Sequence, residues 1–215
     1  MNSIQIANFR KNHLNNLSFP ETIKSWRVLT KVFLQYAASC PSFFSTPTHT
    51  QFFFICRSNE LESLPDVFVN LRTLTEIDLS FNQIYVLNED IGSLSNLVKL
   101  QVNNNKLTTL PKSIGNLKKL QSLEVRSNAI SVLPTELGDL VSLVKLDISH
   151  NKIGELPSEI GKLEKLTNFD WKENVISVPP HAVLAQGVGA TLAYLKARLE
   201  SGPGSPATKK VCLQM

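Results

Sequence analysis

The chain has 215 residues, of which 42% are apolar, and its formal net charge is +4. A chain of this length and composition can bury one continuous core as a single elongated domain. The positive charge does not indicate nucleic-acid binding, because residues 61–180 carry 12 basic and 15 acidic side chains and no basic stripe with interleaved aromatic residues. We therefore expect no nucleic-acid partner.

Residues 1–50 show only fragments of a pattern. The segments FRKNHLNNLSFPETI from Phe9 and LTKVFLQYAASC from Leu29 have apolar positions that fit eroded copies of the repeat found further along the chain. We predict degenerate N-terminal repeats, or a cap that covers the first apolar face of a stack of repeats. The alternative is an unrelated sequence joined to the repeats at about residue 50.

The sequence shows no signal for export. The first twenty residues lack the apolar core of a signal peptide, and no apolar run reaches the roughly 18 residues that a membrane-spanning helix needs. The three cysteines, Cys40, Cys56 and Cys212, do not have the paired spacing of a disulfide framework. We expect a reducing compartment and a cytoplasmic location.

Residues 51–180 contain a leucine and asparagine pattern that recurs about six times at a constant interval. Five windows, which begin at Leu74, Leu97, Leu120, Leu143 and Leu166, follow the pattern L-x-x-L-x-L-x-x-N-x-L. Alternate side chains of a strand face opposite ways, so the central apolar pair of each window points inward. The asparagine amide can both donate to and accept from the backbone, which predicts a ladder of stacked amides. Its members are Asn82, Asn105, Asn128, Asn151 and Asn174, with Asn59 from a degenerate sixth repeat.

A second block follows each asparagine, and its apolar spacing changes from two to three or four, as at Leu110, Ile114 and Leu117. This change predicts a short helical or irregular convex segment. Proline suits the entry to such a turn, and glycine would let the chain turn back toward the next strand. The prolines are Pro65, Pro111, Pro134 and Pro157, and the glycines are Gly92, Gly115, Gly138 and Gly161. The predicted fold is an α/β solenoid with short parallel strands on its concave face.

Pro179 and Pro180 introduce a predicted capping helix over residues 181–200. Its apolar stripe should close the open end of the core. The stripe consists of Val188, Leu192, Leu195 and Leu199. Binding of this helix to a membrane surface is the alternative, which Gly187 and Gly189 disfavour. Residues 201–215 have the composition of a disordered tail, and their end, Cys212-Leu213-Gln214-Met215, formally matches a prenylation motif, although Gln214 is polar where an aliphatic residue is usual.

The pattern LPxxIGxLxxLxxLxLxxNxL resembles that of the intracellular Ras-group leucine-rich-repeat proteins, which include the plant Ras-group-related set and the repeats of Scribble and Erbin. The likeness covers residues 61–180, and the segment from Pro179 is similar to the closing helix of several members. The resemblance implies a horseshoe fold and a non-enzymatic scaffold or adaptor in signalling, with partners in small-GTPase or kinase and phosphatase pathways. Asn88 in place of proline, Trp171 in place of an aliphatic residue, and the low number of repeats depart from the family and indicate a truncated or divergent member.

Partner binding should use the outward strand residues, which stacking brings into rows about 4.7 to 4.9 Å apart on the concave face. The central row is mainly acidic and cations flank it, a pattern that favours a partner with basic residues or, alternatively, a solvated and mutually compensated surface. Phe81 and His150 lie in the next outward row, and an exposed aromatic residue is a frequent anchor. The candidate residues are Asp78, Phe81, Lys99, Gln101, Glu124, Arg126, Lys145, Asp147, His150, Asp170 and Lys172.

Catalysis is not expected. The carboxylates Glu124, Asp147 and Asp170 would lie on an open sheet, where none could be kept dry enough to hold a proton. The four histidines lack metal-ligand spacing, and no phosphate-binding glycine loop or nucleophile motif occurs, so we expect no metal or other cofactor. Two alternatives to the cytoplasmic adaptor stay open: a regulator tethered to the membrane through prenylated Cys212, and a repeat fragment without independent function.

Overall fold

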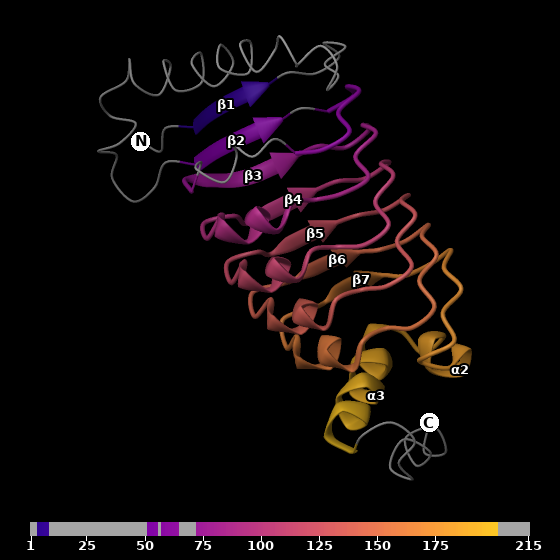
Figure 1. The fold of residues 1–215 in the computed structure, drawn as a ribbon. Coiled ribbons are helices and arrows are strands. Elements are labelled where there is room, and N and C mark those ends of the chain that lie inside the picture. The colour runs from indigo at the N-terminus through magenta and orange to yellow at the C-terminus, as the bar shows by residue number, and fades with distance from the viewer. Residues whose placement is uncertain (1–3, 9–50, 56, 65–71, 202–215) are drawn as a thin grey trace.

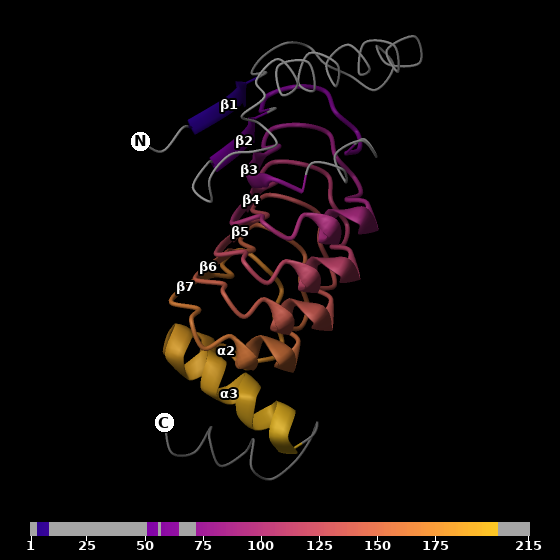
Figure 2. The same ribbon diagram turned by 90° about the vertical axis from the view of Figure 1, so that its left-hand side faces the viewer.

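The computed structural model describes residues 4–8, 51–55, 57–64 and 72–201. In this part of the chain one parallel sheet of seven strands runs in chain order along one side of the solenoid, and short helical turns form the other side (Figures 1 and 2). The strands are β1 Ile4–Asn8, β2 Gln51–Ile55, β3 Leu74–Asp78, β4 Lys99–Gln101, β5 Ser122–Glu124, β6 Lys145–Asp147 and β7 Asn168–Asp170.

The strands from β3 to β7 pair with identical register at each step, so equivalent residues of consecutive repeats lie side by side. In β4 to β7 the central residue is buried and its neighbours are half-buried or exposed, and in β3 the residue at the equivalent place in the register is Ile77, which is also buried. This alternation confirms the predicted solenoid with parallel strands. The buried residues at this place in the register are Ile77, Leu100, Leu123, Leu146 and Phe169.

The N-terminal part contains a strand that the sequence pattern does not indicate. Residues Ile4–Asn8 form β1 and pair in parallel with β2. The proposed eroded repeats from Phe9 and from Leu29 lie outside the described residues. The backbone of β2 also pairs with β3, which makes the repeat around Asn59 part of the same sheet.

The convex segments are 3-10 helices: η3 Glu89–Ser93, η4 Lys112–Asn116, η5 Thr135–Asp139 and η6 Ser158–Lys162. A proline precedes each of the last three, as the sequence predicts. Asn88 takes this place before η3, and its Oδ1 accepts the N–H of Asp90 at 3.1 Å. The side-chain cap replaces the conformational restriction that proline supplies in the other repeats.

The glycines of these turns have a different role from the predicted one. Gly187 is the only glycine with positive φ among the described residues, so the 3-10 glycines do not serve a left-handed turn. A Cβ on Gly92, Gly115 or Gly138 would lie 2.4 to 2.6 Å from a carbonyl oxygen of the next 3-10 helix. Glycine is therefore required because consecutive turns pack backbone against backbone.

The asparagine ladder joins each repeat to the one before it. Asn128 Oδ1 accepts the N–H of Leu107, and its Nδ2 donates to the carbonyls of Val102 and Val125, with all three distances between 2.9 and 3.0 Å. Asn105, Asn151 and Asn174 make the same three bonds in their own repeats. Asn82 and Asn151 are buried, whereas Asn105, Asn128 and Asn174 are half-buried.

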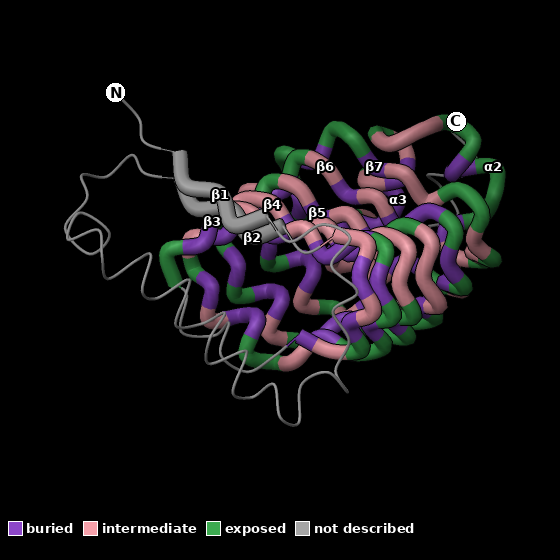
Figure 3. The backbone as a smooth tube through the Cα atoms, turned by 90° about the horizontal axis from the view of Figure 1, so that it is seen from above, coloured by how far each residue is buried: buried purple, intermediate pink, exposed green. Residues whose placement is uncertain are grey.

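The C-terminal end has two helices, α2 His181–Leu184 and α3 Val188–Ser201, in place of the one helix predicted over residues 181–200. The break lies at Gly187, whose φ is 94°. Leu195 is fully buried, and α3 packs on η6 so closely that a Cβ on Gly161 would lie 2.4 Å from Lys196 N. Viewed from above, buried positions run through the interior of the described repeats from β3 onward (Figure 3). No helix in the described ranges is long and apolar enough to cross a bilayer.

Candidate functional site

The sheet brings the predicted surface residues into rows. The pairing register aligns Asp78, Gln101, Glu124, Asp147 and Asp170 in one row. Lys99 and Lys145 lie in the row beside it, with Glu76, Ser122 and Asn168. Arg126 and Lys172 follow their strands by two residues and lie at the carboxyl edge of the sheet, where both are exposed.

Glu124 is the most constrained carboxylate of the central row. It forms a salt bridge of 2.8 Å with Lys145 Nζ, and the glutamate side chain is only 12% exposed. Gln101 and Asn103 donate to its other oxygen at 3.4 and 3.5 Å. Burial acts to raise the pKa of Glu124, but the hydrogen bond and charge of Lys145, together with the two amides, hold the pKa below its ordinary value of 4.5. Glu124 is therefore ionised at neutral pH and already paired within the chain.

The aspartates of the same row also serve the backbone. Oδ1 of Asp78, Asp147 and Asp170 accepts the N–H of the residue two positions later, at 2.9 to 3.1 Å. Oδ1 of Asp147 accepts the Ser149 hydroxyl as well, at 2.7 Å. These carboxylates fix the chain where it leaves the strand, so the acidic row has a structural role in addition to its charge.

Residues of several consecutive repeats line a hollow of ≈ 500 Å³ on the concave face. Phe81 is 45% exposed there, and the guanidinium of Arg57 lies over its ring at 4.7 Å from the centroid. The wall of the hollow contains Arg57, Ser80, Phe81, Gln101, Asn103, Asn104, Glu124, Arg126, Ser127 and Asp147. Arg57 and Asn103 follow their strands by two residues, as Arg126 does, and they are not among the site residues that the sequence predicts. The contact of Arg57 with Phe81 and that of Asn103 with Glu124 join different repeats, so the structure shows them and the repeat pattern does not.

Phe81 and His150 occupy equivalent places in two repeats, each with positive φ, 61° and 54°. This left-handed conformation precedes each ladder asparagine. His150 Nε2 lies 3.2 Å from Arg126 Nη2. Because arginine can only donate, the imidazole nitrogen accepts in this contact.

The hollow gathers about half of the predicted site residues. Those in its wall are Phe81, Gln101, Glu124, Arg126 and Asp147, and His150 contacts Arg126 beside them. The other predicted residues do not line it: Asp78, Lys99, Lys145, Asp170 and Lys172.

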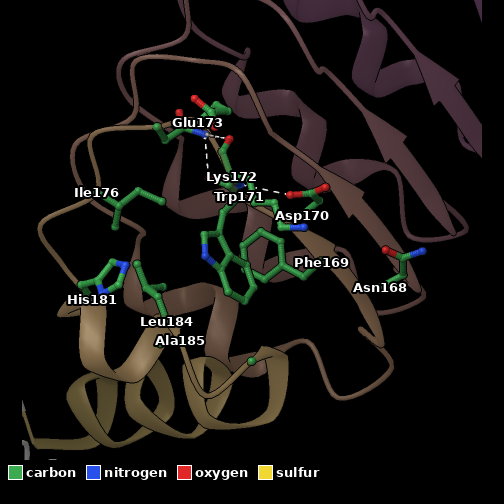
Figure 4. A pocket seen from close by; sticks show the side chains of 12 residues that line it. Asn168, Phe169, Asp170, Trp171, Lys172, Glu173, Ile176, His181, Leu184 and Ala185 are labelled. Carbon is green, nitrogen blue, oxygen red and sulfur yellow. Dashed lines mark hydrogen bonds between the residues drawn. The ribbon is translucent and has the colours of Figure 1, made fainter.

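A second cavity, of ≈ 750 Å³, lies at the C-terminal end between β7 and α2 (Figure 4). The Phe169 and Trp171 rings meet edge to face there, with centroids 4.9 Å apart. The sequence singles out Trp171 only as a departure from an aliphatic position. Asp170 and Lys172, which were predicted to belong to the concave face, line this cavity.

The described residues contain no cluster of metal ligands, and they do not include the candidate lipidation site. No group of three or more His, Cys, Asp or Glu residues in the described ranges could hold a metal ion. Cys212, the candidate for lipidation, lies outside those ranges, and its modification stays a prediction.

Comparison with known proteins identifies the repeats. Residues 95–153 match a family model described as leucine rich repeat, and residues 70–84 match a second model with that description. The fold is a leucine-rich-repeat solenoid. Comparison with curated proteins gives no match.

Several solved leucine-rich-repeat structures are similar to this chain. The plant peptide hormone receptor RGFR1 is 30% identical, with a TM-score of 0.52 over 59% of this chain and 21% of the receptor chain. The ectodomain of GASSHO1/SCHENGEN3 from Arabidopsis thaliana is 32% identical, with a TM-score of 0.54 over 59% of this chain and 16% of that one. An internalin, InlF, from Listeria monocytogenes is 25% identical, with a TM-score of 0.51 over 59% of this chain and 36% of its own. The chain thus spans well under half of the length of each.

Proposed function

We propose that this chain is a non-enzymatic scaffold that binds a protein partner on its concave face. The observation that carries the proposal is the hollow in which Phe81 is 45% exposed beneath the Arg57 guanidinium, next to Arg126. Aromatic and arginine side chains are the commonest strong contributors at protein interfaces. An exposed ring already held by a cation loses little conformational freedom when a partner covers it.

The comparisons support a binding role of this general kind. RGFR1 was solved in complex with RGF2, and GASSHO1/SCHENGEN3 in complex with Casparian strip integrity factor 2. RGF2 and Casparian strip integrity factor 2 are the ligands of these two receptors. For this chain they support a polypeptide as the class of partner.

We further propose a cytoplasmic adaptor role in signal transduction, in a small-GTPase or kinase pathway. The likeness to the Ras-group repeat pattern supports this role, as does the lack of a paired cysteine framework. The central acidic row then sets the approach and register of a partner with basic residues. Affinity comes mainly from the hollow, because Glu124 is already paired with Lys145.

The test substitutes Phe81→Asn in one variant and Asp147→Asn with Asp170→Asn in another. Asparagine is the residue that the next repeat carries at the place of Phe81, where φ is 55°, so the backbone is undisturbed. At the aspartates it keeps an acceptor for the Ser149 and Lys172 N–H groups while removing the charge. Tagged proteins are expressed in eukaryotic cells, and their partners are quantified by affinity capture and mass spectrometry.

We expect Phe81→Asn to lower recovery of the main partner about tenfold or more, and the aspartate pair to lower it most strongly at low salt. The matched control, Asp139→Asn with Glu164→Gln, also replaces two carboxylates by amides, at exposed positions at the end of η5 and two residues after η6, and should leave recovery unchanged. Equal recovery of the same partners from all variants would remove the concave face from consideration.

A further inference from the structure

The last strand of the described sheet has a groove along its unpaired edge. β7 pairs with β6 on one side only. Every residue from 168 to 174 lines the cavity of ≈ 750 Å³, and α2 faces them across it (Figure 4). Trp171 and Ile176 are half-buried there, and Leu184 of α2 is 9% exposed. The groove thus combines an open strand edge with an apolar wall.

The main chain along this groove carries hydrogen-bond donors that earlier repeats use to bind the next strand. Val102, Val125 and Ile148 donate their N–H groups to carbonyls of the following repeat at 2.8 to 2.9 Å. Trp171 is the next member of that series. Likewise His150 donates to the Lys172 carbonyl at 2.9 Å, and Glu173 is its successor. Neither the Trp171 nor the Glu173 N–H has a partner within the described ranges.

The same holds one step further along the chain. In each earlier repeat, the residue two positions after the ladder asparagine donates its backbone N–H to the ladder asparagine of the next repeat. These donors are Ile84, Leu107, Ile130 and Ile153. Ile176 is their counterpart in the last repeat, and its N–H meets no acceptor in the described part of the chain. The three residues that carry these donors, Trp171, Glu173 and Ile176, all line the cavity and follow β7 directly along the chain. Unpaired main-chain donors beside an apolar wall are the features that peptide-binding sheet edges use.

The cap leaves room for a strand but not for a folded repeat. On the convex side α3 packs on η6 at backbone contact, with a Cβ on Gly161 placed 2.4 Å from Lys196 N. On the strand side the chain between α2 and α3 turns at Gly187, which itself lines the groove. A second solenoid would need both halves of the end to be open, whereas a single extended segment needs only the edge of β7.

We propose that this groove binds an extended peptide segment of a partner protein, which adds a strand beside β7. Its main chain accepts from Trp171, Glu173 and Ile176. Its alternate side chains are apolar and pack on Phe169, Trp171 and Leu184. Charge adds only a weak preference for a basic segment, since Asp170 and Glu173 in the lining face the single lysine, Lys172. The site is distinct from the concave hollow and does not depend on the function proposed for it.

The test is a selection of random peptides displayed on phage against the full chain, followed by titration of the enriched synthetic peptides. Trp26→Phe makes Trp171 the sole tryptophan, so that its fluorescence reports occupancy. Ala185→Arg places a large side chain in the groove from an exposed position that lines it. Ala182→Arg is the matched control, because Ala182 is exposed on the same helix and does not line the groove.

We expect enriched peptides with apolar residues at every second position, and saturable changes in Trp171 emission. Binding should fall at least tenfold in Ala185→Arg and persist in Ala182→Arg. N-methylation or ester replacement along the peptide main chain should weaken binding similarly, which an apolar contact alone would not produce. Phe81→Asn should have no effect on this binding, so failure here is separable from failure at the concave face.

Four outcomes would overturn the proposal. One is that every enriched peptide binds Ala185→Arg as tightly as it binds the wild type. Another is equal binding of peptides with a modified and an unmodified main chain. A third is a dimer whose formation is abolished by Ala185→Arg and not competed by peptide, which would assign the edge to a second copy. The last is a change in Trp171 emission when residues 202–215 are deleted, which would show that the chain's own tail occupies the groove.

Discussion

At the scale of single residues, the ladder asparagines bind neighbouring repeats through one amide each. Asn128 accepts from Leu107 and donates to Val102, both in the preceding repeat, and donates to Val125 in its own repeat. Its carboxamide therefore satisfies three backbone groups at the point where strand pairing stops. The interval between asparagines is constant because each one needs the repeat before it in exact register.

Asn128→Ala should destabilise the chain by about 1–3 kcal/mol, because it leaves backbone donors and acceptors unpaired in a half-buried place. Asn116→Ala serves as the control: Asn116 is exposed at the end of η4, so its loss should change stability by less than about 0.5 kcal/mol. Urea unfolding followed by circular dichroism measures both. Equal stability of the two variants would contradict the ladder's energetic role.

Glu124 links stability to pH. Although burial acts to raise the pKa of Glu124, Lys145 and the Gln101 and Asn103 amides keep it below 4.5 in the folded chain. A carboxyl whose pKa is lowered on folding stabilises the fold above the unfolded pKa, and this contribution is lost as the pH falls through the folded pKa. The relevant window is therefore below pH 4.5.

Glu124→Gln should lower the free energy of unfolding by about 1 kcal/mol at pH 7. The difference from wild type should shrink as the pH falls below 4.5, where Glu124 itself becomes protonated. Urea titrations of both proteins between pH 7 and pH 3 provide the measurement, and comparison with the variant removes the contribution of the other carboxyls. A difference that stays constant across this range would disprove the linkage.

At the scale of elements, the 3-10 turns stack by backbone contact. A Cβ on Gly138 would lie 2.4 Å from the Glu159 carbonyl oxygen, while nothing lies within 4 Å of the corresponding position on Gly189 in α3. The same substitution should therefore have opposite effects at the two sites. Packing between turns, rather than backbone conformation, is the reason for glycine at the first.

Gly138→Ala should destabilise the chain by about 1–3 kcal/mol, since two turns must separate to admit the methyl group. Gly189→Ala should stabilise it by about 0.4–1 kcal/mol through the lower entropy of the unfolded chain. Thermal and urea unfolding of both variants decide the matter. Stabilisation by Gly138→Ala would show that the spacing between η5 and η6 relaxes without cost.

At the scale of the whole molecule, the solenoid presents two candidate surfaces with different chemistry. The concave hollow uses side chains from several repeats, among them Arg57, Phe81 and Arg126. The groove at β7 uses the main chain of the last repeat and exists because α3 covers η6 while the strand edge stays open. One surface is a product of stacking, and the other arises where stacking ends.

Much of this architecture follows from the repeat pattern. The spacing of leucines and asparagines predicts the strands, their inward residues and the rows of the concave face, because each repeat has the same local geometry as its neighbour. The pattern misses β1 and treats residues 181–200 as one helix. It also does not indicate Arg57 as a neighbour of Phe81, because a period describes positions and not the reach of side chains.

The sequence alone determined which residues face the core and which face solvent, since alternation within each strand and a constant repeat length leave one consistent arrangement. Only the tertiary structure decided how the outward residues are used. It pairs Glu124 with Lys145, packs Gly92, Gly115 and Gly138 against the next turn, and breaks the cap at Gly187 beside β7. The reason is physical: these features depend on distances between different repeats, or between the last repeat and its cap, and such distances are set only when the solenoid is assembled.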